Sequence, residues 1–264
     1  MTYENLLYDL SEGVATVTLN RPTTYNSLNF ATLDDLKNVF KQIDREKAVR
    51  AVIFTGEGKG FSSGADLAEI GQNFDAPITD HLRNGLNTIV GQMRSLEKPI
   101  IAAINGAAAG AGASLALAAD YRIASENASF VFAAFVNIGL VPDAGGTYLL
   151  QRLVGQAKAF ELALLADSKN RVTAQAALDL GIVNCVVPAD ALMTEARTLA
   201  TRLAQMPTKA IGMTKRAVYR ASERSLLDAM EYEALLQGAA FRTEDFREGV
   251  MAFLEKRTPV FKGE

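Results

Sequence analysis

The sequence predicts an α/β protein that ends in an all-helical region. Up to about residue 189, apolar residues repeat in alternation with the period of strands and the period of helices. Beyond residue 189 only helical patterns remain. The chain has 264 residues, of which 49% are hydrophobic and 22% charged, so it can bury a sizeable core. Such alternation is typical of sheets covered by helices.

The predicted elements follow one another regularly along the chain. Residues 4–9 and 14–19 alternate in hydrophobicity on either side of a Ser-Glu-Gly turn, which predicts a β-hairpin. Helices are indicated where apolar residues recur three and four positions apart, and buried strands where short apolar runs occur. The further elements predicted before residue 189 are helix 32–47, strand 51–54, helix 80–96, strand 100–104, helix 113–119, strand 121–124 and helix 147–154.

The C-terminal helical patterns occupy residues 190–205, 207–221, 224–241 and 243–255. Their apolar residues exceed what a solvated appendage needs, so we expect these helices to pack on the core or on a neighbouring subunit. We therefore divide the chain into a core at residues 1–200 and a C-terminal helical region at residues 201–264.

Charge and hydropathy exclude several classes of function. With 27 basic and 30 acidic residues the formal net charge is −3, and no basic run offers a surface for nucleic acid or an anionic membrane. The first ten residues contain no apolar signal segment. The longest apolar stretch, 100–119, is interrupted by Asn105, so we expect a cytoplasmic protein.

The single cysteine and the single histidine limit the chemistry further. Cys185 has no partner for a disulfide or a thiolate metal cluster, and its apolar neighbours indicate a buried, inert thiol. His81 lies among charged residues in a predicted solvated helix, which argues against a catalytic triad. We therefore expect neither a metal site nor triad hydrolysis.

Two glycine-rich turns are candidates for binding negative charge. Residues 60–67 contain Asp66 as the expected helix N-cap, which leaves the amide of Ala65 unpaired. Residues 105–114 follow a buried strand and open a helix of small residues, so a ligand could approach its free N–H groups closely. Together the turns could form a two-donor oxyanion hole, although each alone also fits a tight loop packed for steric reasons.

The second turn does not match the known nucleotide-binding loops. After Gly110-Ala111-Gly112 there is no third glycine, and no acidic residue follows about twenty positions later, as a dinucleotide site would need. The Gly-Lys-Ser/Thr sequence of a phosphate-binding P-loop is also missing.

Four motifs occur in a set order along the chain: Asn20-Arg21-Pro22 with Asn26-Ser27-Leu28, residues 61–67, Asn105-Gly106 with Gly110-Ala111-Gly112, and residues 139–147. In order and spacing they resemble the enoyl-CoA hydratase/isomerase (crotonase) superfamily, and the similarity extends from residue 4 to residue 261. The resemblance implies a core spiral of ββα repeats and an acyl-CoA ligand, with no cofactor besides the coenzyme A of the substrate. It also implies a C-terminal helical oligomerisation region that makes trimers, often paired into hexamers.

The resemblance implies roles for particular residues. The backbone amides of Ala65 and Ala111 would form the oxyanion hole and polarise the thioester carbonyl, each contributing about 3 kcal/mol to catalysis. Phe253 and Lys256 belong to a segment that often contacts CoA across a subunit boundary, although Lys256 also fits a solvated cation at a helix end. The residues expected to bind CoA or the acyl group are Thr24, Tyr25, Ser27, Gly64, Asp66, Leu67, Ser114, Phe135, Phe253 and Lys256.

The catalytic acids distinguish the branches of the superfamily. Ser114 and Phe135 stand where the hydratases keep two glutamates, so efficient hydration by the two-carboxylate route is not expected. Asp143 matches the single catalytic carboxylate of several isomerases, and an apolar pocket would raise its pKa towards the range of a general base. On the residues alone, Asp143 could equally cap helix 147–154.

Within the superfamily, residues 106–117, the Pro142-Asp143 site and the tail 245–261 look like the isomerases of bacterial phenylacetate degradation, which convert ring-1,2-epoxyphenylacetyl-CoA to the oxepin-CoA. We therefore predict an acyl-CoA isomerase that shifts a double bond or rearranges an epoxide by proton transfer on a stabilised thioester enolate. The alternatives are an enoyl-CoA hydratase of fatty-acid or aromatic-acid catabolism, using Asp143 and a bound water, and a non-catalytic acyl-CoA-binding subunit.

The acyl pocket is expected between Leu67, Ile70, residues 74–88 and residues 132–135. Its two phenylalanines, Phe132 and Phe135, would suit an aromatic or medium-length acyl group.

Overall fold

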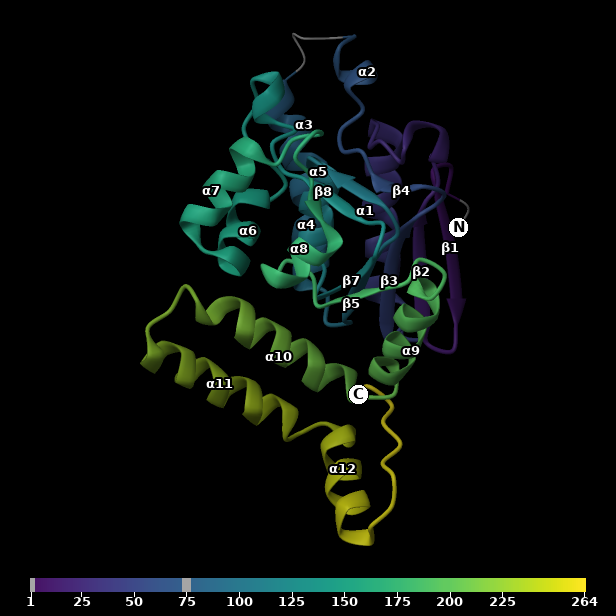
Figure 1. Ribbon diagram of the computed structural model, residues 1–264. Helices are drawn as coiled ribbons and strands as arrows, with labels where there is room; N and C mark the ends of the chain where they lie inside the picture. Colours follow the sequence, from purple (N-terminus) through teal and green to yellow (C-terminus); the bar gives the residue numbers. More distant parts are fainter. Residues whose placement is uncertain (1–2, 73–76) are drawn as a thin grey trace.

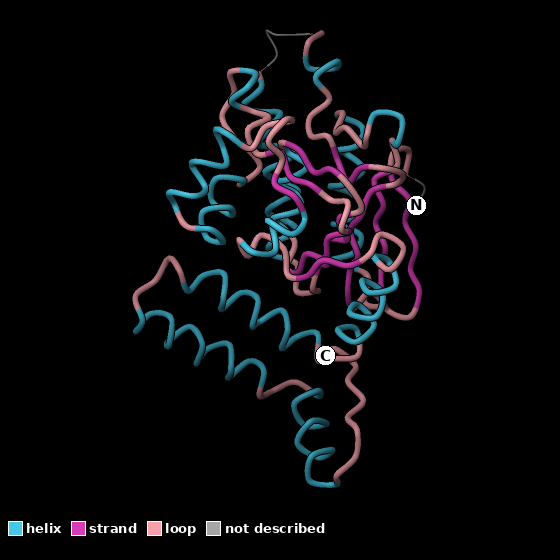
Figure 2. Tube along the Cα trace, in the orientation of Figure 1, coloured by secondary structure: helices cyan, strands magenta, loops and turns pink. Residues whose placement is uncertain are grey.

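The computed structural model describes residues 3–72 and 77–264, and its centre is a pair of β-sheets (Figures 1 and 2). The larger sheet is parallel except at its first pair, where β1 runs antiparallel to β2. Its strands, in spatial order, are β1 (Leu6–Ser11), β2 (Val14–Leu19), β3 (Ala51–Gly56), β5 (Ile100–Ile104), β7 (Tyr121–Ser125) and β10 (Cys185–Val187). The smaller sheet contains, in spatial order, β4 (Gly60–Ser62), β6 (Ala107–Ala109), β8 (Ser129–Val131) and β9 (Val172–Thr173).

The chain alternates between the two sheets as it coils. A strand of the larger sheet leads into a short strand of the smaller sheet and then into a helix. Three such turns follow one another: β3 and β4 precede α2 (Leu67–Ile70), β5 and β6 precede α5 (Ala111–Ala118), and β7 and β8 precede α6 (Gly146–Val154). Successive turns pair in parallel in both sheets, which confirms the predicted α/β spiral of ββα repeats.

Successive side chains of a strand point to opposite faces of the larger sheet, and helices pack on both faces. Phe54 belongs to the main buried cluster together with α1 (Phe30–Arg45), and the ring centroids of Phe40 and Phe54 lie 6.1 Å apart. Its neighbour Ile53 belongs to a second cluster formed with α9 (Leu192–Ala204). The core is therefore built on both faces of one sheet, and α9 is part of it.

The predicted strands of the larger sheet are confirmed, but the smaller sheet was missed. The first strand begins at Leu6 instead of residue 4. Strands β4 and β6 lie inside the two segments predicted as glycine-rich turns, and each has only three residues. Small residues such as Ala and Gly favour strands weakly, so these segments carry no strand pattern although their backbones pair.

The single helix predicted at residues 80–96 is wrong. Two helices occupy the segment, α3 (Ile78–Asn84) and α4 (Leu86–Ser95), and Gly85 separates them. Gly85 has φ −106° and ψ −105°, which is not helical, and a Cβ there would lie 2.6 Å from the His81 carbonyl oxygen. The apolar spacing continues across the break, so the pattern could not reveal it.

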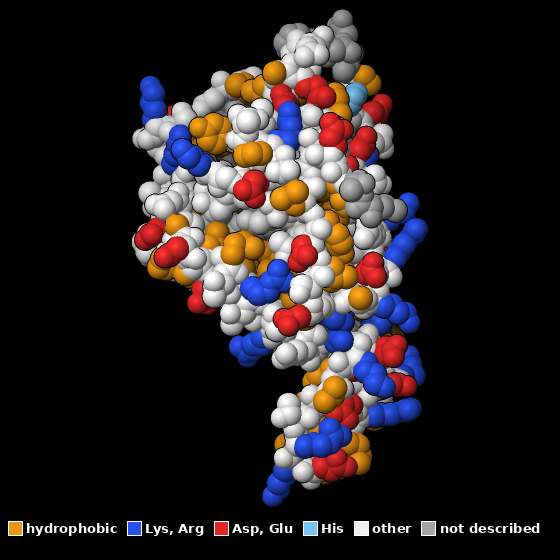
Figure 3. Space-filling model, turned by 90° about the vertical axis from the view of Figure 1, so that its right-hand side faces the viewer, with side chains coloured by type: hydrophobic (Ala, Val, Ile, Leu, Met, Phe, Trp, Pro, Cys, Tyr) orange, Lys and Arg blue, Asp and Glu red, His pale blue; other side chains and the backbone are white. Residues whose placement is uncertain are grey.

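The C-terminal helices leave the body of the molecule one after another (Figure 1). The predicted division after residue 200 falls inside α9, which covers the sheet, and the following helices are α10 (Thr208–Ala221), α11 (Leu226–Ala240) and α12 (Glu244–Glu255). Figure 3 shows the C-terminal part projecting from the body, with apolar side chains among the charged ones. The core does not cover the apolar side chains of α11 and α12, and the most exposed are Leu226, Leu227, Met230, Leu235, Phe253 and Leu254.

The remaining elements are η1 (Pro22–Thr24), η2 (Val136–Ile138), α7 (Gln156–Leu165) and α8 (Ala174–Asp179). Across residues 3–72 and 77–264, no helix has the length and apolar character needed to span a membrane. The same residues contain no group of three or more His, Cys, Asp or Glu side chains arranged to hold a metal ion.

A buried charge cluster fastens α10 to the body. The Lys215 ammonium lies 2.8 Å from Asp120 Oδ2 and also donates a hydrogen bond of 2.8 Å to the Met93 carbonyl. Tyr219 OH donates to the other carboxylate oxygen of Asp120. The side chains of Lys215 and Asp120 are only 6% and 16% exposed, so water screens the pair weakly.

Replacing Asp120 with alanine is expected to lower the free energy of unfolding by about 3 to 5 kcal/mol, because the Lys215 ammonium stays buried without its carboxylate. Urea unfolding followed by circular dichroism measures the change. The exposed pair of Lys209 and Glu97 also joins α10 to the body and serves as the control, with an expected cost below about 1 kcal/mol for Lys209→Ala. Equal losses in the two variants would contradict this assignment.

Candidate active site

The two glycine-rich turns lie against each other at one edge of the smaller sheet. Because β4 and β6 are parallel neighbours, the segments that follow them leave the sheet at the same edge. Gly64 has φ +87°, and a Cβ there would lie 2.7 Å from the Ala109 carbonyl oxygen and 3.2 Å from the Ala111 amide nitrogen. Only glycine permits this close approach of two backbone segments.

The amides of Ala65 and Ala111 have no hydrogen-bond acceptor within the described residues. Leu28 pairs with the residues on either side of Ala65: its N–H donates to Gly64 O at 2.8 Å and its carbonyl accepts from Asp66 N at 3.1 Å. Ala111 is the first residue of α5, where an N–H has no carbonyl of its own helix to bind. The N-terminus of the buried α5 adds a positive dipole at this point.

Asp66 holds the first turn in place. Its Oδ2 atom accepts hydrogen bonds from Arg21 Nη1 at 2.9 Å and Ser27 Oγ at 3.0 Å, and its side chain caps α2 by accepting from Glu69 N, as predicted. Burial alone would raise the pKa of Asp66, but the hydrogen bonds from Arg21 and Ser27 outweigh burial and lower the pKa. The Asp66 and Ser27 side chains are thus engaged with each other.

The other residues predicted near the first turn are accessible. The Ser63 N–H donates to the Tyr25 carbonyl at 2.8 Å, and Ser63 Oγ donates to the Thr24 carbonyl at 3.1 Å, which joins η1 to the turn. Tyr25 and Leu67 are 58% and 52% exposed. The structure therefore brings six of the predicted binding residues together around Ala65: Thr24, Tyr25, Ser27, Gly64, Asp66 and Leu67.

Asp143 is a half-buried carboxylate with one of its oxygens shielded from solvent. Its backbone carbonyl accepts hydrogen bonds from Ser114 Oγ at 3.0 Å and Gly146 N at 2.8 Å, which fixes the turn that precedes α6. Its Oδ1 atom is buried, and no described residue donates a hydrogen bond to it. Burial raises the pKa of Asp143 from its ordinary value of 3.8 to about 6. The group can therefore exchange a proton near neutral pH.

The alternative that Asp143 caps a helix is wrong. The N-cap of α6 is Gly145, and no side chain caps that helix. Ser114 and Phe135 are buried nearby, with exposed fractions of 3% and 7%, and neither is acidic. A Cβ on Gly146 would lie 2.6 Å from Ser114 Oγ, so α6 approaches α5 as closely as a backbone can.

An apolar cavity of about 370 Å³ opens beside Asp143. Pro142, which precedes Asp143, lines it, as do Ser114 and Gly146, which hold the Asp143 carbonyl. Gly110, which precedes the Ala111 amide, lines it as well. No lining residue carries a charge, and the further lining residues are Phe132, Phe135, Val136, Leu140, Val141, Thr147, Leu150, Gln151, Gln156, Ala159, Phe160, Ala163 and Leu164.

The wall of the cavity differs from the predicted one. Phe132 and Phe135 line it as expected, but Leu67 and Ile70 do not, nor do residues 77–88. The helix pair α6 and α7 takes their place, and sequence analysis missed it because their positions depend on how the loops fold. Residues 74–76 of the predicted wall lie outside the described residues.

Phe253 and Lys256 do not meet the other predicted residues within one chain. They lie at the end of α12, at the bottom of Figure 1, whereas α2 lies at the top. Phe253 is 83% exposed, and Lys256 has φ +57° where it ends the helix.

The single histidine and the single cysteine do not line the cavity. His81 packs on the Phe30 ring with a centroid distance of 4.7 Å. Cys185 is half-buried instead of buried, because it lies on β10 at the edge of the larger sheet.

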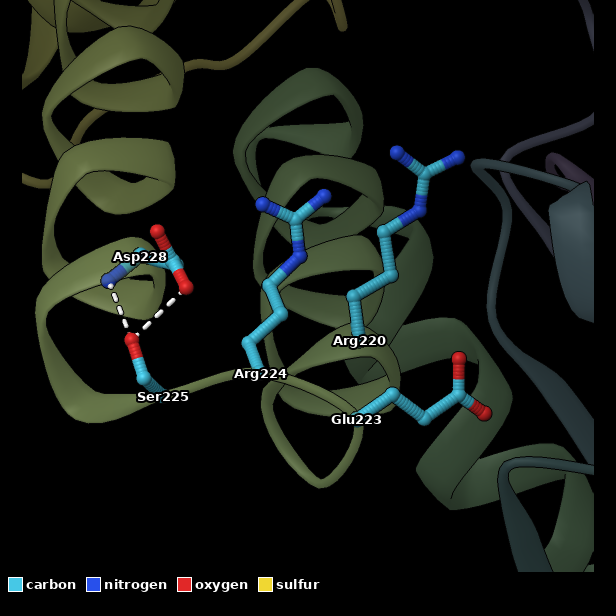
Figure 4. Close-up of a pocket in the computed structure, with 5 residues that line it drawn as sticks. All are labelled: Arg220, Glu223, Arg224, Ser225 and Asp228. Atoms are coloured by element: carbon cyan, nitrogen blue, oxygen red, sulfur yellow. Dashed lines mark hydrogen bonds between the residues drawn. The ribbon is translucent and has the colours of Figure 1, made fainter.

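A second hollow lies at the turn between α10 and α11 (Figure 4). Ser225 caps α11, accepting from Asp228 N at 3.2 Å and donating to Asp228 Oδ2 at 2.7 Å. The guanidinium groups of Arg220 and Arg224 lie 5.4 Å and 4.7 Å from the centroid of the Tyr232 ring. These contacts order the turn, and the hollow contains none of the predicted site residues.

The fold is an α/β spiral. Its candidate site combines two unpaired amides, a half-buried carboxylate and an apolar cavity, which suits an apolar ligand that carries a polar group. Residues 9–264 match the family model described as enoyl-CoA hydratase/isomerase. The chain therefore belongs to the enoyl-CoA hydratase/isomerase family, as its motifs predict.

Relatives of the chain include both an isomerase and a hydratase. The chain is 41% identical to the 1,2-epoxyphenylacetyl-CoA isomerase of Escherichia coli (strain K12), over 98% of this chain and 99% of the relative. It is 37% identical to the crotonyl-CoA hydratase of Syntrophomonas wolfei, over 99% of both chains. A crystal structure of enoyl-CoA hydratase from Bacillus anthracis matches with a TM-score of 0.90 at 35% identity, over 99% of this chain and 100% of that one.

Proposed function

We propose that the protein is an acyl-CoA isomerase that moves a proton on a thioester enolate with Asp143 as its single catalytic carboxylate. The observation that carries the proposal is the setting of this group: its Oδ1 atom is buried without a donor, and its pKa is raised to about 6. The residues at positions 114 and 135 are a serine and a phenylalanine, so they add no second acid.

The proposed reaction needs one base and two hydrogen-bond donors. The amides of Ala65 and Ala111 bind the thioester oxygen and stabilise the negative charge that forms on it. The Asp143 carboxylate takes a proton from the carbon next to the thioester of a 3-enoyl-CoA, and the electron pair moves onto the thioester oxygen. The protonated Asp143 then returns the proton further along the chain, which gives the conjugated 2-enoyl-CoA and restores the carboxylate.

A related substrate is a ring epoxide of the kind named for the Escherichia coli relative, because the sequences are 41% identical over nearly their whole lengths. In that case the protein acts in phenylacetate catabolism, whereas a 3-enoyl-CoA substrate places it in fatty-acid metabolism. We propose a cytoplasmic location for either role.

The competing function is hydration of an enoyl-CoA, supported by the similarity to crotonyl-CoA hydratase. Asp143 would then act on a bound water, and a second acid would have to come from elsewhere. A non-catalytic acyl-CoA-binding subunit is the remaining alternative.

The test is to incubate the protein with a 3-enoyl-CoA and, separately, with crotonyl-CoA, and to follow the absorbance of the conjugated enoyl thioester. An isomerase raises the absorbance with the first substrate and leaves the second nearly unchanged. A fall with crotonyl-CoA identifies a hydratase and contradicts the proposal. Tight binding of both thioesters without any change identifies a binding subunit.

The apolar side chains of α11 and α12 support assembly into a homotrimer or a hexamer. Leu226 and Leu227 are 75% and 76% exposed, and a monomer would leave this surface in water. Light scattering coupled to size exclusion is expected to give three or six times the chain mass of 28.3 kDa. Leu227→Glu should dissociate the assembly, whereas Glu233→Gln on the same helix should not; a monomeric wild-type protein would contradict this prediction.

A further inference from the structure

We propose that the cavity beside Asp143 selects uncharged acyl groups of about eight to ten carbons, with Ala159, Gln151 and Gln156 setting its outer part. The inference rests on the proposed function, since it identifies the substrates of the same site. It concerns the part of the acyl group that lies beyond the reacting carbons.

The cavity runs along the hairpin of α6 and α7. One end is defined by Ser114 and Gly146, next to Asp143. From Gly146, α6 advances about 1.5 Å per residue to the turn at Gly155, a distance of roughly 13 Å. An extended chain advances about 1.2 Å per bond, so about ten bonds cover this length.

Small residues of α7 leave room for the chain. The helix begins at Gln156 and packs against α6, and the lining residues 159, 160, 163 and 164 share one face of it. Ala159 and Ala163 keep this face shallow, whereas the larger Phe160 is 68% exposed. The resulting volume of about 370 Å³ falls in the range of pockets that hold ligands larger than a four-carbon group.

The polarity of the cavity argues against a charged acyl chain. No lysine, arginine or histidine lines it, so a terminal carboxylate would be desolvated without a partner. Of the polar lining residues, Ser114 is engaged with the Asp143 carbonyl. The amides of Gln151 and Gln156 lie towards the far end of α6, and they can hydrogen-bond a neutral hydroxyl, ether or carbonyl oxygen there.

The first test measures binding separately from catalysis. Dissociation constants of saturated acyl-CoAs from butanoyl to dodecanoyl are measured by calorimetry, because these thioesters cannot react. We expect affinity to rise by up to about fourfold per methylene as far as eight to ten carbons and then level off. Octanoyl-CoA should bind at least 100-fold more tightly than its analogue with a terminal carboxylate. Equal binding of that pair, or no gain beyond four carbons, would overturn the inference.

The second test changes the cavity itself. Ala159→Leu should shift the preferred chain by about two to four carbons towards shorter acyl groups, whereas Ala157→Leu, on the exposed face of the same helix, should leave it unchanged. Gln151→Lys should reduce the discrimination against the terminal carboxylate at least tenfold. An unchanged chain-length preference in Ala159→Leu, with thermal unfolding like that of the wild type, would contradict the inference, as would unchanged charge discrimination in Gln151→Lys.

The outcome separates the two proposals. A protein that shows the expected binding series but isomerises no 3-enoyl-CoA retains this inference and loses the proposed function. A protein that isomerises only four-carbon substrates retains the function and loses the inference.

Discussion

Replacing Asp143 with asparagine is expected to lower the kcat of isomerisation about a thousandfold, because general base catalysis contributes roughly 10² to 10⁴. Asparagine has almost the same shape but cannot accept the proton. The Asp143 backbone carbonyl would still accept from Ser114 and Gly146, so the turn should keep its conformation. Binding of a saturated acyl-CoA should therefore change by less than about threefold, and single-turnover kinetics with a 3-enoyl-CoA would measure the loss.

The pH dependence checks the same assignment. The carboxylate is the active form and its pKa is about 6, so kcat/KM should be full above pH 7 and fall tenfold per pH unit below about pH 5. Asp34→Asn, which changes an exposed carboxylate on α1, is the control and should keep both the rate and this profile. A variant at position 143 that keeps full activity with the wild-type profile would refute the assignment.

Asp143→Asn should be more stable than the wild type at neutral pH. Because the pKa of Asp143 is higher in the folded than in the unfolded protein, the native state binds the proton more tightly between about pH 4 and pH 6. The free energy of unfolding of the wild type therefore falls as the pH rises through this window. The fall is at most about 3 kcal/mol, because the pKa of Asp143 differs by some two units between the folded and unfolded states. Removal of the buried charge should remove this loss, which urea unfolding at pH 4 and pH 7 would measure.

Ala111→Pro is expected to lower kcat/KM by a factor of about 100 to 1,000 by removing one of the two proposed oxyanion donors. Ala111 is the first residue of α5, a position where proline is tolerated because its N–H has no helical partner. The proline ring also fills space where the thioester oxygen would lie. The helix should therefore form normally, and the loss should appear in catalysis and much less in thermal stability.

A matched control separates the missing N–H from the effect of proline on a helix. Glu244 occupies the same first position in α12, after the N-cap Thr243, and it lies outside the candidate site. Glu244→Pro should leave kcat/KM within about twofold of the wild type. If Ala111→Pro isomerised its substrate at the normal rate, the Ala111 amide would have no part in the reaction.

Every strand of the larger sheet except β10, and most helices, could be predicted from periodicity alone. The strand β3 is buried on both faces and its sequence begins with an unbroken apolar run, whereas α1 is buried on one face and its apolar residues recur at helical spacing. In both elements the burial therefore follows from the sequence pattern. The smaller sheet could not be predicted in this way, because β4 and β6 have only three residues each, too few for a pattern, and are held by backbone pairing. The break at Gly85 depends on backbone angles, which leave no mark on the apolar spacing.

The candidate site was predicted in part, and mainly through family resemblance. The motifs located Asp143 and the two turns, and the structure places those turns in contact. Helix α6 was predicted, but α7 and the part that both helices play in the cavity wall were missed, because residues such as Gln151 and Ala163 look like ordinary surface and core positions until the loops are placed. The exposed positions of Phe253 and Lys256 in a single chain also follow from where α12 projects.

The close contact between Ser114 of α5 and Gly146 of α6 limits which side chains position 114 can accept. The Ser114 hydroxyl lies against Gly146 and donates to the Asp143 carbonyl, so a glutamate at position 114 would lose this hydrogen bond and would have to extend into the cavity or displace the loop at residues 139–146. In this backbone, acquiring a second acid at 114 therefore disturbs the acid already at 143. We therefore expect directed-evolution libraries that vary position 114 alone to yield no efficient hydratase, and libraries that also vary residues 139–146 to be needed for one.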